Sequence, residues 1–157
     1  MSLNPSRLLA PLAGVLLAMA SGMVAAQATQ ATPVGTWKTI DDKTKTERAQ
    51  VRIQEEGGVL TGRIEKLLAP DANHDGVCDK CSDDRKDKPI VGMELLRGVK
   101  KNADAADLWD GGTILDAAEG KVYKVRLKPV DGGRRMEVRG YIGAPLLGRT
   151  QTWVRVD

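Results

Sequence analysis

Phenylalanine is absent from this chain, and no run of like charges is longer than two residues. A nucleic-acid-binding protein needs a concentrated basic face, ideally with aromatic side chains on which bases stack. Three tryptophans and two tyrosines are the whole aromatic content, and the 24 Lys and Arg are interspersed with 21 Asp and Glu. Nucleic acid is therefore excluded as a partner, and the core has to be built largely from Val, Ile, Leu and Met.

Groups for nucleophilic catalysis are almost as scarce. His74 is the only histidine, so any Ser-His-Asp or Cys-His arrangement would have to use it. The chain has no Gly-X-Ser-X-Gly motif. Asp110, Asp116 and Glu119 could supply an acid and a base, but aspartates beside glycines more commonly form turns. No catalytic residue is assigned, and an enzyme of unknown class is the least favoured function.

Long hydrophobic runs are missing after residue 26, which sets the N-terminus apart from the rest. Residues 1–26 contain a single basic residue, Arg7, followed by an apolar stretch, and end in Val24-Ala25-Ala26. A basic start, an apolar middle and small residues before the cut are typical of a secretory signal peptide. The apolar stretch is short for a membrane span of about 20 residues. We expect cleavage after Ala26, export to the periplasm and no membrane span in what remains.

The residues that follow this segment are enough for one domain and few for two. Residues 27–34, QATQATPV, are mostly small and polar, which predicts a flexible leader. A single domain is expected over residues 35–157. The chain has 17 glycines and, beyond the signal segment, only short apolar runs, which predicts many turns and short strands.

Alternation of apolar and polar residues is the main secondary-structure signal. Apolar residues at 49, 51 and 53 alternate with polar ones before Gly57-Gly58, and alternation resumes over 59–68, which predicts a β-hairpin. A second hairpin is predicted over 121–143 around Asp131-Gly132-Gly133. The matching apolar faces of its two strands are Tyr123, Val125 and Leu127 on one side and Met136, Val138 and Ile142 on the other. Further strands are predicted over 35–40, 90–96, 111–116 and 146–156.

These runs predict about eight strands in hairpin order, with no long helical crossover between them. Residues 97–109 could hold a helical turn or two. Closing one antiparallel sheet on itself buries its inner face and leaves no open edge, and about eight strands enclose side chains or one small ligand. We therefore predict an all-β fold, a small up-and-down antiparallel barrel; a two-sheet sandwich is the alternative.

Several stretches of the sequence resemble a known bacterial family. They are GTWKT (35–39), CDKC (78–81), PIVGMELLRG (89–98), GGTILDAAEGKVYKVRL (111–127) and MEVRGYIGAPLLGRTQTWVRV (136–156). Over nearly all of its length after residue 34 the chain is similar to the uncharacterised exported family numbered 2147 among domains of unknown function. The resemblance implies a lipocalin-like barrel and a periplasmic location, but no particular activity. Ala117 departs from the family, which usually carries proline after the aspartate of ILD.

A weaker similarity to lipocalins at large concerns the closure of the barrel. Lipocalins pair a Gly-X-Trp on the first strand with an arginine late in the last strand. Here Gly35-Thr36-Trp37 begins the barrel, and Arg149 or Arg155 lies near its end. A guanidinium over an indole face is worth about 0.5–2 kcal/mol and would join the first strand to the last. The resemblance thus implies structural closure by Gly35, Trp37, Arg149, Trp153 and Arg155.

Residues 71–84, DANHDGVCDKCSDD, concentrate the groups that could bind a metal ion. Zinc would need four Cys or His ligands, and Cys78, Cys81 and His74 supply three at most. A calcium loop is the closer match, but its twelfth position carries Ser82 in place of the expected glutamate. The weak calcium candidate consists of Asp71, Asn73, Asp75 and Asp79. No metal ion or other cofactor is favoured.

The two cysteines of this segment are expected to form a disulfide, the simplest outcome for nearby cysteines in an oxidising, exported compartment. A redox role would need a thiolate stabilised by cations or by a helix N-terminus. Most charged neighbours of Cys78 and Cys81 are aspartates, which oppose thiolate formation. We predict a structural disulfide in a charged loop over one mouth of the barrel.

An apolar lumen with one or two polar anchors binds a ligand without any catalytic group. We therefore predict a periplasmic protein that binds a small lipophilic or amphipathic molecule inside its barrel, anchored by Arg149 or a tyrosine hydroxyl. The alternatives are a filled barrel that acts as an envelope or stress-related interaction module, and the enzyme mentioned above; no protein partner is predicted. The expected lining residues are Val51, Ile53, Leu60, Ile64, Tyr123, Val125, Met136, Val138 and Arg149.

Overall fold

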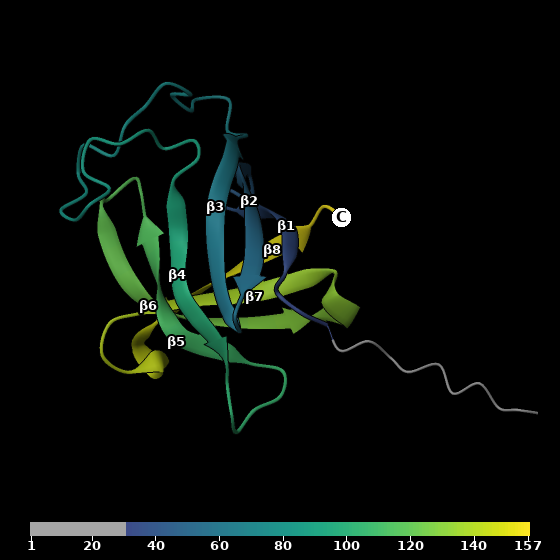
Figure 1. Cartoon of the computed structure of the whole chain (residues 1–157). Helices are drawn as coiled ribbons and strands as arrows, with labels where there is room; N and C mark the ends of the chain where they lie inside the picture. Colours follow the sequence, from purple (N-terminus) through teal and green to yellow (C-terminus); the bar gives the residue numbers. More distant parts are fainter. Residues whose placement is uncertain (1–30) are drawn as a thin grey trace, which may run out of the picture.

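The structure is a computed structural model that describes residues 31–157; the signal peptide predicted over 1–26 lies outside them. Over the described residues, eight antiparallel strands follow one another around a closed barrel in which β8 pairs with β1 (Figure 1). The strands are β1 Gly35–Ile40, β2 Glu47–Glu56, β3 Val59–Leu67, β4 Glu94–Lys101, β5 Trp109–Asp116, β6 Lys121–Val130, β7 Arg135–Tyr141 and β8 Arg149–Arg155. Two short 3-10 helices, η1 Asp131–Gly133 and η2 Pro145–Leu147, lie in connections. The predicted up-and-down barrel is confirmed, and the sandwich alternative is wrong.

Both predicted hairpins form around their glycine turns. Gly57 and Gly58 take positive φ values of 58° and 78° between β2 and β3, a conformation that side chains with a Cβ rarely adopt. The η1 turn joins β6 to β7. Residues 97–109 hold no helix, because β4 continues to Lys101 and the chain then turns into β5.

Three strands have other bounds than predicted; β8 begins at Arg149 instead of residue 146, and β4 and β7 differ as follows. β4 begins at Glu94 instead of residue 90, because residues 90–93 belong to the preceding connection. β7 ends at Tyr141, so Ile142 does not face the interior with Met136 and Val138 as predicted; it is largely exposed in the β7–β8 connection. In both places a glycine with positive φ, Gly92 or Gly143, interrupts the extended chain.

The meander gives the barrel two ends, which we call the floor and the mouth. The floor holds the entry of the chain before β1, the turns 57–58 and 131–134, and the loop 102–108. The mouth holds the connections 41–46, 68–93, 117–120 and 142–148. In Figure 1 the floor lies toward the lower right and the mouth toward the upper left.

The core fills the interior toward the floor. Trp37 on β1 and Trp153 on β8 are both buried there, and Met136 lies opposite Trp153 in the β7–β8 register. These large side chains fill the space that phenylalanine rings occupy in the cores of other proteins. The fully buried inner residues are Trp37, Val51, Ile53, Leu60, Leu96, Val99, Val125, Leu127, Met136 and Trp153.

The leader predicted over 27–34 is attached to the barrel at its last residues. Trp37 Nε1 donates a hydrogen bond to Pro33 O at 2.7 Å, and Arg155 Nη1 donates to Val34 O at 2.9 Å. Side chains of the barrel floor thus hold the carbonyl groups of Pro33 and Val34, and the flexibility of the leader over 27–34 stays a prediction.

Candidate functional site

The floor is closed by a stacked arginine–tryptophan pair. The Arg155 guanidinium lies 4.2 Å from the centroid of the Trp37 ring. It also donates to Gly133 O at 2.6 Å and to Val34 O at 2.9 Å. Gly35 leaves room for it, because a Cβ at that position would overlap the guanidinium. One side chain thus connects the first strand, the last strand and the β6–β7 turn.

Arg149, the other arginine predicted to close the barrel, lies at the opposite end. Its Nε donates to Asp42 Oδ2 at 2.7 Å, so β8 is linked to the β1–β2 connection at the mouth rim. This hydrogen bond lowers the pKa of Asp42 from its ordinary value. Arg149 cannot stack on Trp37, because it begins β8 at the mouth whereas Arg155 ends β8 at the floor.

Most of the predicted lining residues lie together on the inner face, where they form the core. Seven of them are buried: Val51, Ile53, Leu60, Ile64, Val125, Met136 and Val138. They pack in a single cluster with all three tryptophans of the chain, Trp37, Trp109 and Trp153. Tyr123 is only partly buried and Arg149 is exposed.

The inner face is less buried toward the mouth. Ile114 and Tyr123 lie opposite each other on β5 and β6, and Gly140 on β7 is beside them. A Cβ added at Gly140 would meet Tyr123 Cβ at 3.6 Å and Ile114 Cγ2 at 3.8 Å, which are ordinary contacts. The partly exposed residues of this part, which we call the mouth lining, are Thr39, Leu67, Ile114, Tyr123, Gly140 and Gln151. The lining is mainly apolar, with hydroxyl groups on Thr39 and Tyr123 and an amide on Gln151.

The connection 68–93 builds a second, smaller core at the mouth end. Cys78 and Cys81 form the predicted disulfide and are buried with Met93 and Leu115. The β5–β6 turn approaches so closely that a Cβ at Gly120 would overlap the backbone of this connection. The disulfide is thus confirmed, and it holds the connection against the outer side of β5.

A buried arginine, which the sequence analysis missed, anchors the same connection. Arg85 Nη2 donates to Asp83 Oδ2 at 2.5 Å, and Arg85 Nη1 donates to Glu94 O at 3.0 Å. The hydrogen bonds from Arg85 lower the pKa of Asp83 to about 2. Arg97 makes two further bonds to Asp84, of 2.7 and 2.9 Å. Such paired charges line much of a surface pocket of about 420 Å³, so we assign these groups a structural role.

Two side chains of the calcium candidate are engaged with other partners. Asp71 Oδ1 accepts a hydrogen bond from Arg48 Nη1 at 3.3 Å, and Asn73 Oδ1 accepts one from Asp75 N at 3.2 Å. Within residues 31–157, no group of three or more His, Cys, Asp or Glu side chains is placed to hold a metal ion. Calcium binding by Asp71, Asn73, Asp75 and Asp79 stays a prediction.

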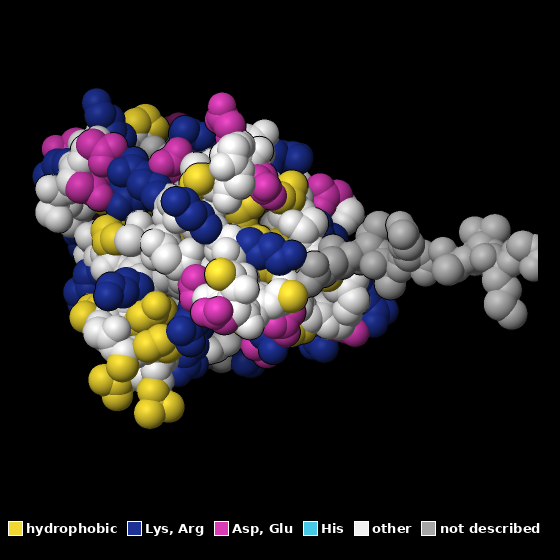
Figure 2. All heavy atoms as spheres, turned by 60° about the horizontal axis from the view of Figure 1, so that its bottom comes forward, with side chains coloured by type: hydrophobic (Ala, Val, Ile, Leu, Met, Phe, Trp, Pro, Cys, Tyr) yellow, Lys and Arg dark blue, Asp and Glu magenta, His cyan; other side chains and the backbone are white. Residues whose placement is uncertain are grey.

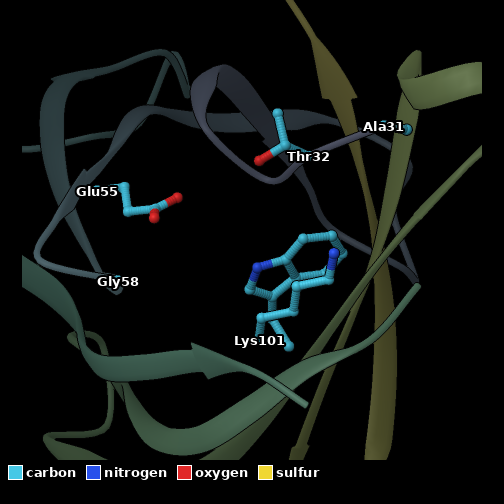
Figure 3. Close-up of a pocket in the computed structure, with 6 residues that line it drawn as sticks. Ala31, Thr32, Glu55, Gly58 and Lys101 are labelled. Carbon is cyan, nitrogen blue, oxygen red and sulfur yellow. The ribbon is translucent and has the colours of Figure 1, made fainter. Parts of the chain in front are cut away.

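A second opening lies at the floor. It measures about 260 Å³ and is lined by Ala31, Thr32, Glu55, Gly58, Lys101 and Trp109. Figure 3 shows the Glu55 carboxylate and the Thr32 hydroxyl directed toward the space beside Lys101. The Lys101 ammonium lies 5.6 Å from the centroid of Trp109, which is almost fully buried. Ligand pockets usually measure about 300–1,000 Å³ and are mostly apolar, so this small polar opening is a weak candidate.

Among solved structures, protein HP1028 from the human pathogen Helicobacter pylori, described as belonging to the lipocalin family, has a similar fold. The TM-score is 0.69 at 19% identity, over 81% of this chain and 84% of that chain. At this identity the likeness shows the fold alone. A comparison with curated proteins finds no match. None of the helices in residues 31–157 has the length and apolar character to cross a bilayer.

The family comparison agrees with the resemblance seen in the sequence. Residues 35–155, nearly all of the barrel, match the family described as "Uncharacterized protein conserved in bacteria (DUF2147)". The description names no activity, so the function has to be argued from the barrel itself. The chain belongs to this family of bacterial proteins.

Proposed function

We propose that the protein binds a small lipophilic or amphipathic molecule in the mouth half of its barrel. The observation that carries the proposal is the change in burial along the inner face. Trp37, Met136 and Trp153 are fully buried toward the floor, whereas Ile114 and Tyr123 stay partly exposed toward the mouth. Apolar side chains of this kind on a concave surface are what a small ligand covers in eight-stranded barrels. The lipocalin-like fold supports the same function.

The chemistry of the mouth favours a ligand with an apolar body and an anionic end. Leu67, Ile114 and the ring of Tyr123 offer apolar surface to the body of the ligand. The Arg149–Asp42 ion pair stands on the rim. Exposed ion pairs are weak because water screens them. A carboxylate on the ligand could therefore replace Asp42 as the partner of Arg149.

The proposal is tested by filling the mouth. Gly140→Val places a side chain beside Tyr123 and Ile114, where its first atom makes only ordinary contacts, and valine is favoured in strands. We expect the wild-type protein to take up a fluorescent long-chain fatty acid and Gly140→Val to lose this uptake with an unchanged circular dichroism spectrum. Thr152→Val adds apolar volume on the outward face of β8 and should keep the uptake.

Native mass spectrometry of the protein purified from the cells that make it gives a second readout. The wild-type protein and Thr152→Val should carry a small molecule that Gly140→Val lacks. Full uptake of the fatty acid by Gly140→Val would refute binding in the mouth. An empty wild-type protein that also takes up no probe would refute ligand binding altogether.

We also propose that the protein works in the periplasm. The signal peptide predicted over 1–26 and the Cys78–Cys81 disulfide, a bond that persists in oxidising compartments, support this location. Protein from a periplasmic extract should have the mass of residues 27–157 with one disulfide. Recovery of the full-length chain with reduced cysteines from the cytoplasmic fraction would contradict this proposal.

A barrel that acts through its surface without a ligand, as an envelope or stress-related interaction module, is the second candidate. The packed floor half favours it, because residues such as Val51, Leu60 and Val125 are already covered by protein. The two readouts above separate the candidates. Absence of a bound molecule in both would leave the surface module as the better explanation.

A further inference from the structure

The β7–β8 connection carries the most exposed large apolar side chains of residues 31–157. Ile142, Leu146 and Leu147 are 68, 86 and 80% exposed, and we call these three residues the apolar tip. Figure 2 shows apolar side chains projecting from the body of the protein at the lower left. Single exposed apolar residues are ordinary on protein surfaces, but a projecting group of them marks a site of interaction.

Part of the backbone at the tip is already hydrogen-bonded within the protein. Arg139 Nε donates to Pro145 O at 2.6 Å, and Arg139 Nη2 donates to Leu146 O at 3.0 Å. Leu147 N donates to Ala144 O at 3.1 Å, and proline has no N–H group. Transfer of an unpaired backbone group into an apolar medium is costly. These carbonyl groups keep their partners, so the tip can enter such a medium with a smaller penalty.

Basic side chains lie at the base of the tip on its β6–β7 side. In the two rows of outward-facing residues nearest to it, β6 and β7 carry Lys124, Arg126 and Arg139 and no acidic residue. Asp110 on β5 approaches Arg126 only to 3.8 Å, a long ion pair. The ring of Tyr141 completes this surface, with the Arg126 guanidinium 6.0 Å from its centroid. Figure 2 shows Lys and Arg side chains on both sides of the projection.

We propose that the apolar tip docks the barrel onto an anionic lipid surface. Ile142, Leu146 and Leu147 enter the headgroup region, while Lys124 and Arg126 lie beside lipid phosphates. An apolar tip with basic and tyrosine side chains at its base is the composition that favours the interface of an anionic bilayer. A narrow projection also suits a fluid lipid surface, whereas a protein partner would need a matching groove.

Docking through the tip places the mouth of the barrel next to the lipid. The tip lies in the connection 142–148, and Arg149 of the mouth rim follows it directly. A lipophilic ligand would then pass between bilayer and barrel over a short distance. The docking itself does not depend on ligand binding, so the failure of one proposal leaves the other open to its own test.

The first test places a fluorophore in the tip. The emission of Leu146→Trp should shift to the blue when vesicles of phosphatidylglycerol are added, and brominated acyl chains should quench it. Val156→Trp, at an exposed apolar position near the floor, should show no change. Attachment through the apolar segment that precedes residue 31 would instead change the emission of Val156→Trp. No shift in Leu146→Trp, or equal shifts in both variants, would overturn the proposal.

The second test removes the apolar side chains. Leu146→Ser/Leu147→Ser should lower the affinity for phosphatidylglycerol vesicles about tenfold or more. Val154→Ser, which removes an exposed apolar side chain from the outer face of β8, should bind like the wild type. Lys124→Glu should weaken binding to phosphatidylglycerol, and the wild type should bind phosphatidylcholine vesicles less tightly.

The same variants show whether the apolar tip binds a second copy of the chain instead of lipid. Analytical ultracentrifugation without lipid should show the same mass for the wild type and Leu146→Ser/Leu147→Ser. Should the wild type form a dimer that the double variant loses, with no binding to vesicles, the tip covers a second copy of the chain and the lipid proposal falls. Equal vesicle binding by the wild type and the double variant would overturn it as well.

Discussion

At the floor of the barrel the Arg155 guanidinium stacks on Trp37 inside the structure, whereas at the mouth Leu146 and Leu147 point into solvent. At the floor the charged Arg155 side chain is partly buried, stacks on the Trp37 ring and donates hydrogen bonds to backbone carbonyl groups. The mouth turns apolar groups outward and leaves part of its inner lining uncovered. The contrast teaches that buried contacts which maintain the fold are concentrated at the floor, while apolar side chains at the mouth stay exposed.

The largest effect is expected from a floor tryptophan. Trp37→Ala removes a fully buried indole and should lower the free energy of unfolding by about 3–5 kcal/mol. Ile114→Ala removes a partly exposed side chain at the mouth and should lower it by about 1 kcal/mol. Urea denaturation followed by circular dichroism measures both values. Equal losses would mean that the two ends contribute alike to stability.

The two arginines of β8, Arg155 at the floor and Arg149 at the mouth, should contribute differently to stability. Arg155→Met leaves the carbonyls of Val34 and Gly133 without their donor, and should lower the free energy of unfolding by about 2–4 kcal/mol. Arg149→Met breaks an exposed ion pair with Asp42 and should leave the urea midpoint unchanged. A large loss for Arg149→Met would show that the rim also maintains the fold.

The Asp83–Arg85 pair makes the stability of the mouth depend on pH. Arg85 lowers the pKa of Asp83 from 3.8 to about 2, so the stabilisation is complete above pH 3.8 and is lost as the pH falls toward 2. Because Asp83 is partly exposed, water screens the pair, and Asp83→Asn should cost about 1 kcal/mol at pH 7. In urea titrations the difference from wild type should shrink below pH 3.8. A difference that is constant down to pH 2 would contradict this assignment.

The smallest effect is expected from calcium. Asp71 is paired with Arg48, and the candidate segment lacks the bidentate glutamate of a calcium loop. Millimolar calcium chloride should therefore leave the melting temperature equal to that in a chelator. A rise of several degrees that Asp75→Ala abolishes would instead establish the calcium site.

The strands could be predicted because alternation follows directly from a sheet with one wet and one buried face. The stretch from Ala49 to Ile53 shows this, and so does the stretch from Tyr123 to Leu127. The sequence limited the arginine that stacks on Trp37 to Arg149 or Arg155 but did not distinguish between them. Arg149 and Arg155 are six residues apart and share one face, so the choice depends on where β8 begins. That boundary is set by η2, which alternation does not reveal.

The mouth was harder to predict because it depends on contacts between distant segments. Arg85 is buried through Asp83 and the carbonyl of Glu94, and no local pattern marks it beyond being an arginine in an acidic run. Leu146 and Leu147 extend the alternating run before β8, yet Pro145 cannot donate to a sheet and the chain leaves the barrel there. How far side chains fill the lumen depends on register shifts in β2, β3 and β4, which the sequence does not display.

The seam between β1 and β8 has a consequence for how the cylinder opens. It consists of two register pairs, Trp37 with Arg155 and Lys38 with Val154, whereas β6 and β7 share seven. Amide protons along the seam should accordingly exchange with deuterium earlier than those of other strand pairs. If β1 and β8 separate, each exposes an unpaired strand edge. A second molecule opened in the same way can pair with these edges, so domain swapping and fibril growth would start at this seam. Because Arg155 on β8 stacks on Trp37 on β1, it should also oppose this association between molecules.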